Sequence, residues 1–86
     1  MLLKVDHHSG VPIYRQLLDQ IKQQVLSGRL EAGQRLESVR DVAGRLKVNP
    51  MTVSKVYSLL EREGFVERRR GVGIFVRKIG RNKRQV

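Results

Sequence analysis

The apolar positions of this chain form three stretches with helical spacing, followed by two short stretches that alternate. The third helical stretch has the clearest ends. Asn49 can cap its first turn, Pro50 suits a first helical position that needs no N–H, and Gly64 suits the left-handed position after the end. These signals predict one helix within residues 49–64. Its apolar stripe has i, i+3, i+4, i+7 spacing and consists of Val53, Val56, Tyr57 and Leu60.

The face opposite this stripe is small, polar and cationic over the first two turns, which run from Pro50 to Ser58. No acidic residue occurs in the helix before Glu61. A short helix with this outer face fits the major groove of DNA, and a solvated surface helix is the alternative on this stretch alone. The outer face and its flanks consist of Met51, Thr52, Ser54, Lys55 and Ser58.

The first helical stretch begins at Pro12 and ends at Gly28. Its apolar stripe is wide enough to pack against two elements, or against one element and a partner subunit. After it, residues 29–37 predict a turn at Gly33 and a very short strand at 35–36. The stripe consists of Ile13, Tyr14, Leu17, Leu18, Ile21 and Val25, with a polar side of Gln16, Gln20, Gln23 and Gln24.

The second helical stretch is capped by Ser38, with Asp41 three residues later as in a capping box, and ends near Leu46. Only residues 47–49 separate it from the third helix. Two short amphipathic helices joined in this way predict a helix-turn-helix, whose second helix enters the groove. Arg40 lies off the apolar stripe of this helix. It is either an ordinary surface arginine or a contact to DNA.

After Gly64 the apolar positions alternate with a period of two residues, which predicts strands at 65–69 and 74–77. Gly71 and Gly73 supply the positive φ angles of the turn between them. A hairpin with a basic tip after a helix-turn-helix is typical of a wing, and a solvated charged loop is the alternative. The basic residues near the tip are Arg68, Arg69 and Arg70.

The remaining segments flank this unit. Residues 1–11 predict an extended arm, and residues 12–77 one winged helix-turn-helix domain. Residues 78–86 predict a basic tail, either a shortened linker or an arm on phosphate. The apolar arm residues, which either pack on the domain or face a partner, are Leu2, Leu3 and Val5.

Composition narrows the function. The chain has 86 residues, enough for one domain, and Lys plus Arg exceed Asp plus Glu by 18 to 8. This excess suits a polyanionic partner, most simply nucleic acid, although ribosomal and membrane-surface proteins share it. No apolar run has the length of a membrane span, so we expect a cytoplasmic protein.

Catalysis and metal binding have little support in this sequence. There is no cysteine, and the two histidines, His7 and His8, are neighbours that point in different directions. No Ser/His/Asp spacing or phosphate-cradling loop occurs; Gly71 and Gly73 lie in a hairpin and not before a helix. We therefore expect no enzyme, no metal site and no cofactor.

Three segments in this order and spacing resemble a known family: PIYRQLLDQI, LSGRLEAGQRLESVRDVAGRL and VNPMTVSKVYSLLEREGFVERRRGVGIFV. Over roughly residues 11–77, the chain is similar to the DNA-binding domain of the GntR family of bacterial transcription regulators, nearest to its YtrA-like branch. The resemblance implies an α+β, mainly helical fold of three helices and a C-terminal β-hairpin wing. It also implies a bacterial cytoplasmic, nucleoid-associated repressor that binds inverted repeats of double-stranded DNA as a homodimer.

The resemblance further implies which residues contact DNA. Ser38 can meet a phosphate through its hydroxyl or the helix N-terminus. Family members continue into a C-terminal effector or dimerisation domain, and no effector pocket is evident in this chain. The residues that match the family's motif are Arg40, Asn49, Met51, Thr52, Ser54, Lys55, Arg70 and Gly71.

The chain departs from the family pattern at two positions. Glu37 replaces the usual proline before the capping serine and brings a negative charge towards phosphate. Lys47 replaces the usual glycine between the two helices, where a positive φ costs a non-glycine residue about 1 kcal/mol. The alternative function is a winged-helix module for protein or RNA contact without operator specificity.

Overall fold

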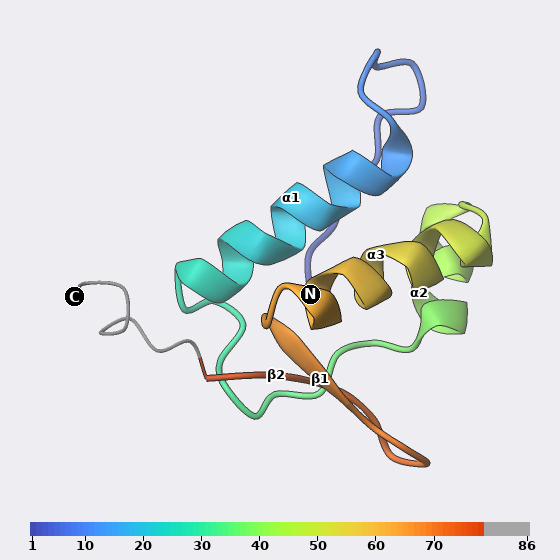
Figure 1. Cartoon of the computed structure of the whole chain (residues 1–86). Helices are drawn as coiled ribbons and strands as arrows, with labels where there is room; N and C mark the ends of the chain where they lie inside the picture. The colour runs from blue at the N-terminus through green and yellow to red at the C-terminus, as the bar shows by residue number, and fades with distance from the viewer. Residues whose placement is uncertain (79–86) are drawn as a thin grey trace.

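The computed structural model describes residues 1–78 and contains three helices followed by a β-hairpin. Figure 1 shows α1 alongside α3, with α2 beside the N-terminal end of α3 and the hairpin extending from the helices. The winged helix-turn-helix predicted from the sequence is confirmed. In the described part of the chain, no helix is long and apolar enough to cross a membrane. The elements are α1 (Ile13–Leu26), α2 (Val39–Leu46), α3 (Pro50–Arg62), β1 (Val66–Arg69) and β2 (Gly73–Val76).

The apolar stripe of α3 is the centre of the core. All four of its predicted residues are at most 1% exposed, and α3 packs against α1, α2 and β1. The α1 stripe lies against the same cluster, although its first turn is only half-buried at Ile13 and Tyr14. Four residues of the α1 stripe, Leu17, Leu18, Ile21 and Val25, therefore pack within the domain. The most deeply buried core residues are Leu17, Ile21, Val42, Val53, Val56, Tyr57, Leu60 and Val66.

The helix ends follow the sequence signals. The Asn49 side chain accepts a hydrogen bond from the Met51 N–H at 2.8 Å, and Ser38 Oγ accepts one from the Asp41 N–H at 3.0 Å. Gly64 has φ +83° after α3. Lys47 has φ +55° in the turn, so a lysine takes the left-handed position where the family usually has glycine.

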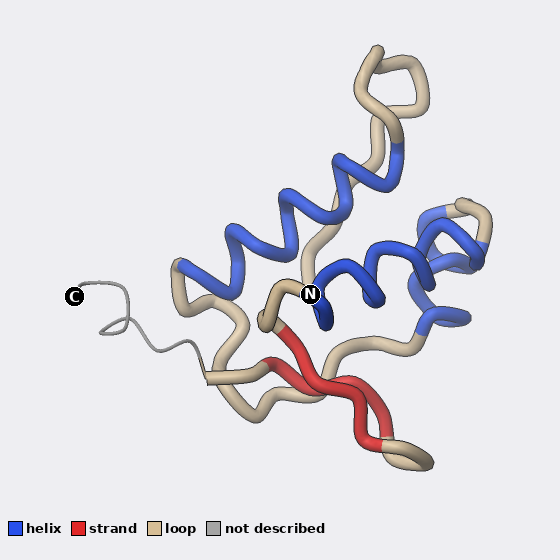
Figure 2. The backbone as a smooth tube through the Cα atoms, viewed as in Figure 1, coloured by secondary structure: helices blue, strands red, loops and turns tan. Residues whose placement is uncertain are grey.

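The linker between α1 and α2 runs beside the hairpin (Figure 2). Arg35 forms a bridge with Phe75, and the Leu36 N–H donates to the Ile74 carbonyl at 2.8 Å, so the predicted short strand is an isolated bridge. The antiparallel strands pair Val66 with Val76 and Arg69 with Gly73. The strands begin and end within one residue of the predicted positions.

The N-terminal arm packs on the domain through Leu3, which is 6% exposed and belongs to the core, whereas Leu2 is exposed. Glutamine side chains of α1 hold the backbone of the arm along the helix. The Gln16 carboxamide bonds to Asp6, and that of Gln24 bonds to Leu2. The sequence predicts only a polar surface for these glutamines. The end of the predicted basic tail, residues 79–86, lies outside the described residues.

Candidate nucleic-acid interface

The outer face of α3 is exposed over its first two turns. Met51 is 77% exposed, and Thr52, on its flank, is half-buried. Because the opposite stripe is buried, the helix is held firmly while this face remains open to a groove. The exposed candidates on α3 are Pro50, Met51, Ser54, Lys55 and Ser58.

Two of the candidates at this helix have intramolecular contacts. The Asn49 side-chain oxygen is occupied by the helix cap, which leaves its amide N–H groups to meet DNA. The Lys55 ammonium lies 4.1 Å from the centroid of the Tyr14 ring, a cation–π contact with α1. This contact turns Lys55 towards α1, which places its charge at the side of the groove-facing surface.

The start of α2 lies beside both the first turn of α3 and the hairpin. Arg40 is exposed and lines a hollow of about 610 Å³ together with Pro50, so the two candidates are neighbours. Ser38 is also exposed, and its hydroxyl can still donate a hydrogen bond because the cap uses it only as an acceptor.

Glu37 does not leave an unpaired negative charge at this surface. Both its carboxylate oxygens accept hydrogen bonds from the Arg45 guanidinium, at 2.5 and 3.3 Å. Its backbone carbonyl accepts a hydrogen bond from the Tyr57 hydroxyl at 2.6 Å. Burial, reinforced by the Glu37 charge, raises the pKa of Tyr57 well above its ordinary value, while Arg45 lowers it slightly. Tyr57 is therefore a neutral donor that ties α3 to the start of α2.

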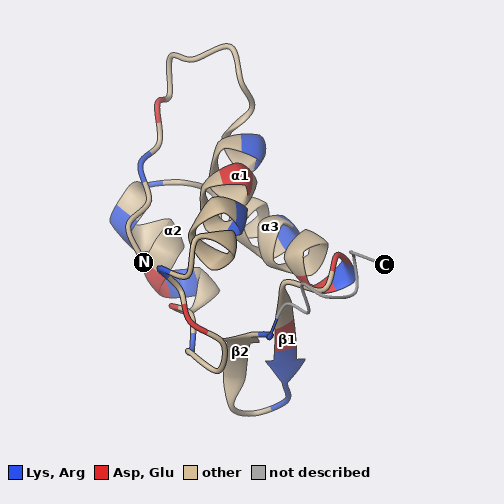
Figure 3. Ribbon diagram, turned by 90° about the vertical axis from the view of Figure 1, so that its left-hand side faces the viewer, with Lys and Arg blue, Asp and Glu red and all other residues tan. Residues whose placement is uncertain are grey.

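The three wing arginines differ in how they are held. Arg69 bonds to Glu67 at 2.8 Å and stacks on Phe75, with Cζ 4.3 Å from the ring centroid. Arg68 pairs with Glu61 of α3 at 3.5 Å. Within residues 1–78, Arg70 has no ion pair, and it lies with the exposed Gly71 at the turn of the hairpin. Figure 3 shows the basic colour along β1, which leads into this turn. Arg70 is thus the wing arginine most readily available to a ligand.

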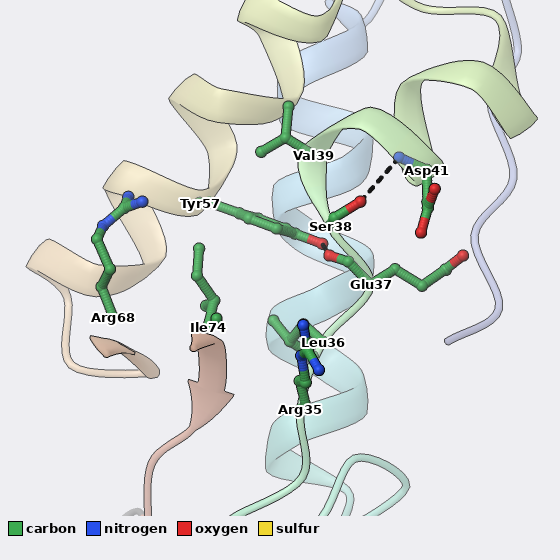
Figure 4. Close-up of a pocket in the computed structure, with 10 residues that line it drawn as sticks. Arg35, Leu36, Glu37, Ser38, Val39, Asp41, Tyr57, Arg68 and Ile74 are labelled. Carbon is green, nitrogen blue, oxygen red and sulfur yellow. Dashed lines mark hydrogen bonds between the residues drawn. The ribbon is translucent and has the colours of Figure 1, made fainter. Parts of the chain in front are cut away.

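A second hollow, of about 470 Å³, lies between the linker, the start of α2 and the hairpin (Figure 4). It brings together Ser38, at the start of α2, and Arg68, in β1, with the whole of α3 between them in the chain. It also contains Arg35, which was not among the predicted contacts. The predicted strand at 35–36 was the available signal, because alternation places Arg35 opposite the buried Leu36. No cluster of three or more His, Asp or Glu able to hold a metal occurs within the described residues.

Residues 13–76 match the family model described as bacterial regulatory proteins, gntR family. The chain belongs to this family. The HTH-type transcriptional repressor YtrA of Bacillus subtilis is 43% identical over 75 residues, which cover 87% of this chain and 58% of that protein. This GntR-family chain spans between 56% and 61% of the length of the first three curated relatives.

Solved structures agree with this assignment. YtrA from Sulfolobus acidocaldarius, a GntR-family transcription factor, superposes with a TM-score of 0.84 and 34% identity, over 99% of this chain and 89% of that one. The DNA-binding domain of AraR, in complex with operator ORX1, has a TM-score of 0.77 at 21% identity, over 88% of this chain and 98% of that one. The AraR likeness establishes only the shared fold.

Proposed function

We propose that this GntR-family chain binds double-stranded DNA with sequence preference and regulates transcription. The observation that carries the proposal is the outer face of α3, which is open over two turns, has no acidic residue before Glu61, and is flanked by a basic wing. The name of the B. subtilis relative, a transcriptional repressor, supports the same function.

The proposed mechanism is occlusion of a promoter. Two copies bind an inverted repeat as a homodimer and place their α3 helices in major grooves about one helical turn apart. The wing grips the adjacent backbone or minor groove. Most of the affinity comes from phosphate contacts, so binding falls steeply as salt rises.

Sequence preference is assigned to a few side chains. Arg40 reads a guanine, Asn49 and Thr52 make hydrogen bonds, and Met51 touches a thymine methyl. The exposure of Arg40 and Met51 supports their part in this assignment. Ser38 and Lys55 contact phosphate instead, one beside the helix cap and the other at the α1 side of α3.

One observation favours the second candidate, a winged-helix module for protein or RNA contact. Lys55, Arg68 and Arg69 already have intramolecular partners, so fewer cations are free than the sequence suggests. If this candidate holds, substitutions on the outer face of α3 leave duplex binding unchanged.

Binding selection on a random duplex library separates the two candidates. The proposed function predicts enrichment of an inverted repeat, and sedimentation of the complex with that repeat gives two copies per duplex. In a gel shift on random duplex DNA, binding should be clear at low salt and weaken as salt rises. No retarded band at low salt, or no enriched sequence, contradicts the proposal.

A further inference from the structure

The hollow between the linker, α2 and the hairpin contains an arginine, Arg35, to which the proposed function gives no role. Its volume is about 470 Å³. In Figure 4, Arg35 comes from the linker and Arg68 from β1, while Ser38 and Tyr57 lie towards the two helices. Each wall therefore belongs to a different element of the DNA-binding fold.

Two features fix Arg35 in this hollow: its main chain is paired with β2, and its side chain lies against Gly73. The bridge to Phe75 fixes its main chain against β2. A Cβ at Gly73 would lie 2.8 Å from Arg35 Nε, so the guanidinium fills the space that a side chain at Gly73 would occupy. Among residues 1–78, Arg35 makes no ion pair, and its planar set of N–H donors is free to bind an anion.

Two arginines, Arg35 and Arg68, and two carboxylates, Glu37 and Asp41, line the hollow. The Glu37 carboxylate is bound by Arg45, which leaves Asp41 as the lining carboxylate without an ion pair in the described chain. Arg68 is paired with Glu61, but both side chains are almost half exposed, and such pairs contribute little stability, so Arg68 can turn to a stronger ligand. The Ser38 hydroxyl adds a neutral donor.

The position of the hollow identifies the anion. When α3 fills a major groove and the wing meets the next minor groove, the sugar–phosphate backbone between the grooves must pass between α3 and the hairpin. We propose that this hollow receives one backbone phosphate of the bound duplex, with Arg35 as its main ligand and Ser38 and Arg68 beside it. The proposal rests on the proposed DNA binding. Arginine suits this task because its fork binds phosphate through two N–H groups.

The test compares Arg35→Ala with Arg29→Ala, which removes the same charge from the exposed turn after α1. Affinity is measured by gel shift or anisotropy over a salt series, on the selected operator and on random duplex DNA. Arg35→Ala should weaken binding roughly tenfold on both duplexes, because phosphate contacts are independent of sequence. It should also reduce the slope of log K against log salt by about 1. Arg29→Ala should bind with the affinity and salt slope of the parent. The affinity of Arg35→Lys should lie between those of the parent and Arg35→Ala.

A second measurement changes the DNA as well as the protein, and it covers the case in which Arg35→Ala folds poorly. Single phosphates of the operator are replaced by uncharged methylphosphonates, one position at a time. At one position between the major and minor grooves, this replacement should lower the affinity of the parent protein for the duplex. The same replacement should not lower the affinity of Arg35→Ala any further; if that variant is unfolded, Arg35→Gln is used in its place.

Several outcomes overturn the proposal. One is that Arg35→Ala binds with the affinity and salt slope of Arg29→Ala; another is that it loses affinity only for the operator, which indicates a base contact. The proposal is also overturned if no methylphosphonate position weakens the parent without weakening the Arg35 variant. If the parent binds no duplex at low salt, the proposed function fails and this inference fails with it; if the parent binds and only the Arg35 results are negative, the proposed function stands.

Discussion

The Gln20 side chain bonds to both backbone groups of Lys4: its oxygen accepts from the Lys4 N–H at 2.9 Å, and its nitrogen donates to the Lys4 carbonyl at 2.7 Å. Gln16 bonds in the same way to both backbone groups of Asp6, one turn earlier in α1, and Gln24 donates one hydrogen bond to the Leu2 carbonyl, one turn later. Four residues of helix rise about 6 Å, and two residues of extended chain span about 6.6 Å. Every fourth residue of α1 can therefore bond to every second residue of the arm. The arm therefore lies antiparallel along α1.

Replacement of Gln20 should loosen this arm. Gln20→Ala removes two hydrogen bonds, and because the site is open to water we expect a loss of about 1 kcal/mol, or roughly 4–8 °C in the melting temperature. Thermal denaturation followed by circular dichroism measures it. Gln23→Ala, on the exposed side of the same helix, is the matched control. Equal melting temperatures for the two variants would show that the arm contributes nothing to stability.

Lys47→Gly should stabilise the domain. Lys47 holds φ +55°, which costs a lysine about 1 kcal/mol more than a glycine, while the extra freedom of glycine in the unfolded chain offsets part of the gain. We expect a net gain of about 0.5 kcal/mol, seen as a higher urea midpoint with an unchanged slope. Lys47→Val, which tolerates a positive φ less well, should lower the midpoint.

Tyr57→Phe should destabilise the domain by about 1–2 kcal/mol, because it leaves the Glu37 carbonyl without its buried donor. The folded pKa of Tyr57 is raised by burial, so the parent's advantage is fully present below the ordinary tyrosine pKa near 10. Above that pH the unfolded tyrosine ionises and the advantage shrinks. Urea denaturation of both proteins at pH 8 and pH 11 tests this, and a constant difference would contradict it.

Arg40→Ala should weaken operator binding by about 1–3 kcal/mol and relax the preference at one base pair, with little effect on random duplex DNA. The selection experiment repeated with this variant measures the change in preference. If the variant binds the operator as tightly as the parent does, Arg40 does not read a base. Arg29→Ala again controls for the loss of one charge.

Arg70 and Arg69 should have different effects when each is replaced by alanine. Arg70 has no ion pair within residues 1–78, so its loss should weaken DNA binding and leave the melting temperature unchanged. Arg69 is held by Glu67 and Phe75, so its loss should lower stability more than affinity. The two variants are compared by gel shift and by thermal melting, and the reverse pattern would refute the assignment.

Interactions between residues that are close in sequence were sufficient to predict the helices and the strands. Caps at Ser38 and Asn49, the positive φ of Gly64 and the four-residue stripe of α3 are properties of neighbouring residues, so the sequence determined them. The same holds for the hairpin, because its period and its two turn glycines depend only on nearby positions. The helix-turn-helix followed from the three-residue spacing between two such helices.

Contacts between distant residues were decided only by the tertiary structure. Whether a glutamine is a solvated side chain or a clamp on the N-terminal arm depends on what packs beside α1. The pairing of Glu37 with Arg45, the contact of Lys55 with Tyr14, and the hollow that joins Arg35 to Arg68 likewise join side chains through space. Sequence periodicity specifies which face a residue occupies, but the partner it meets there is set by the packing of the whole chain.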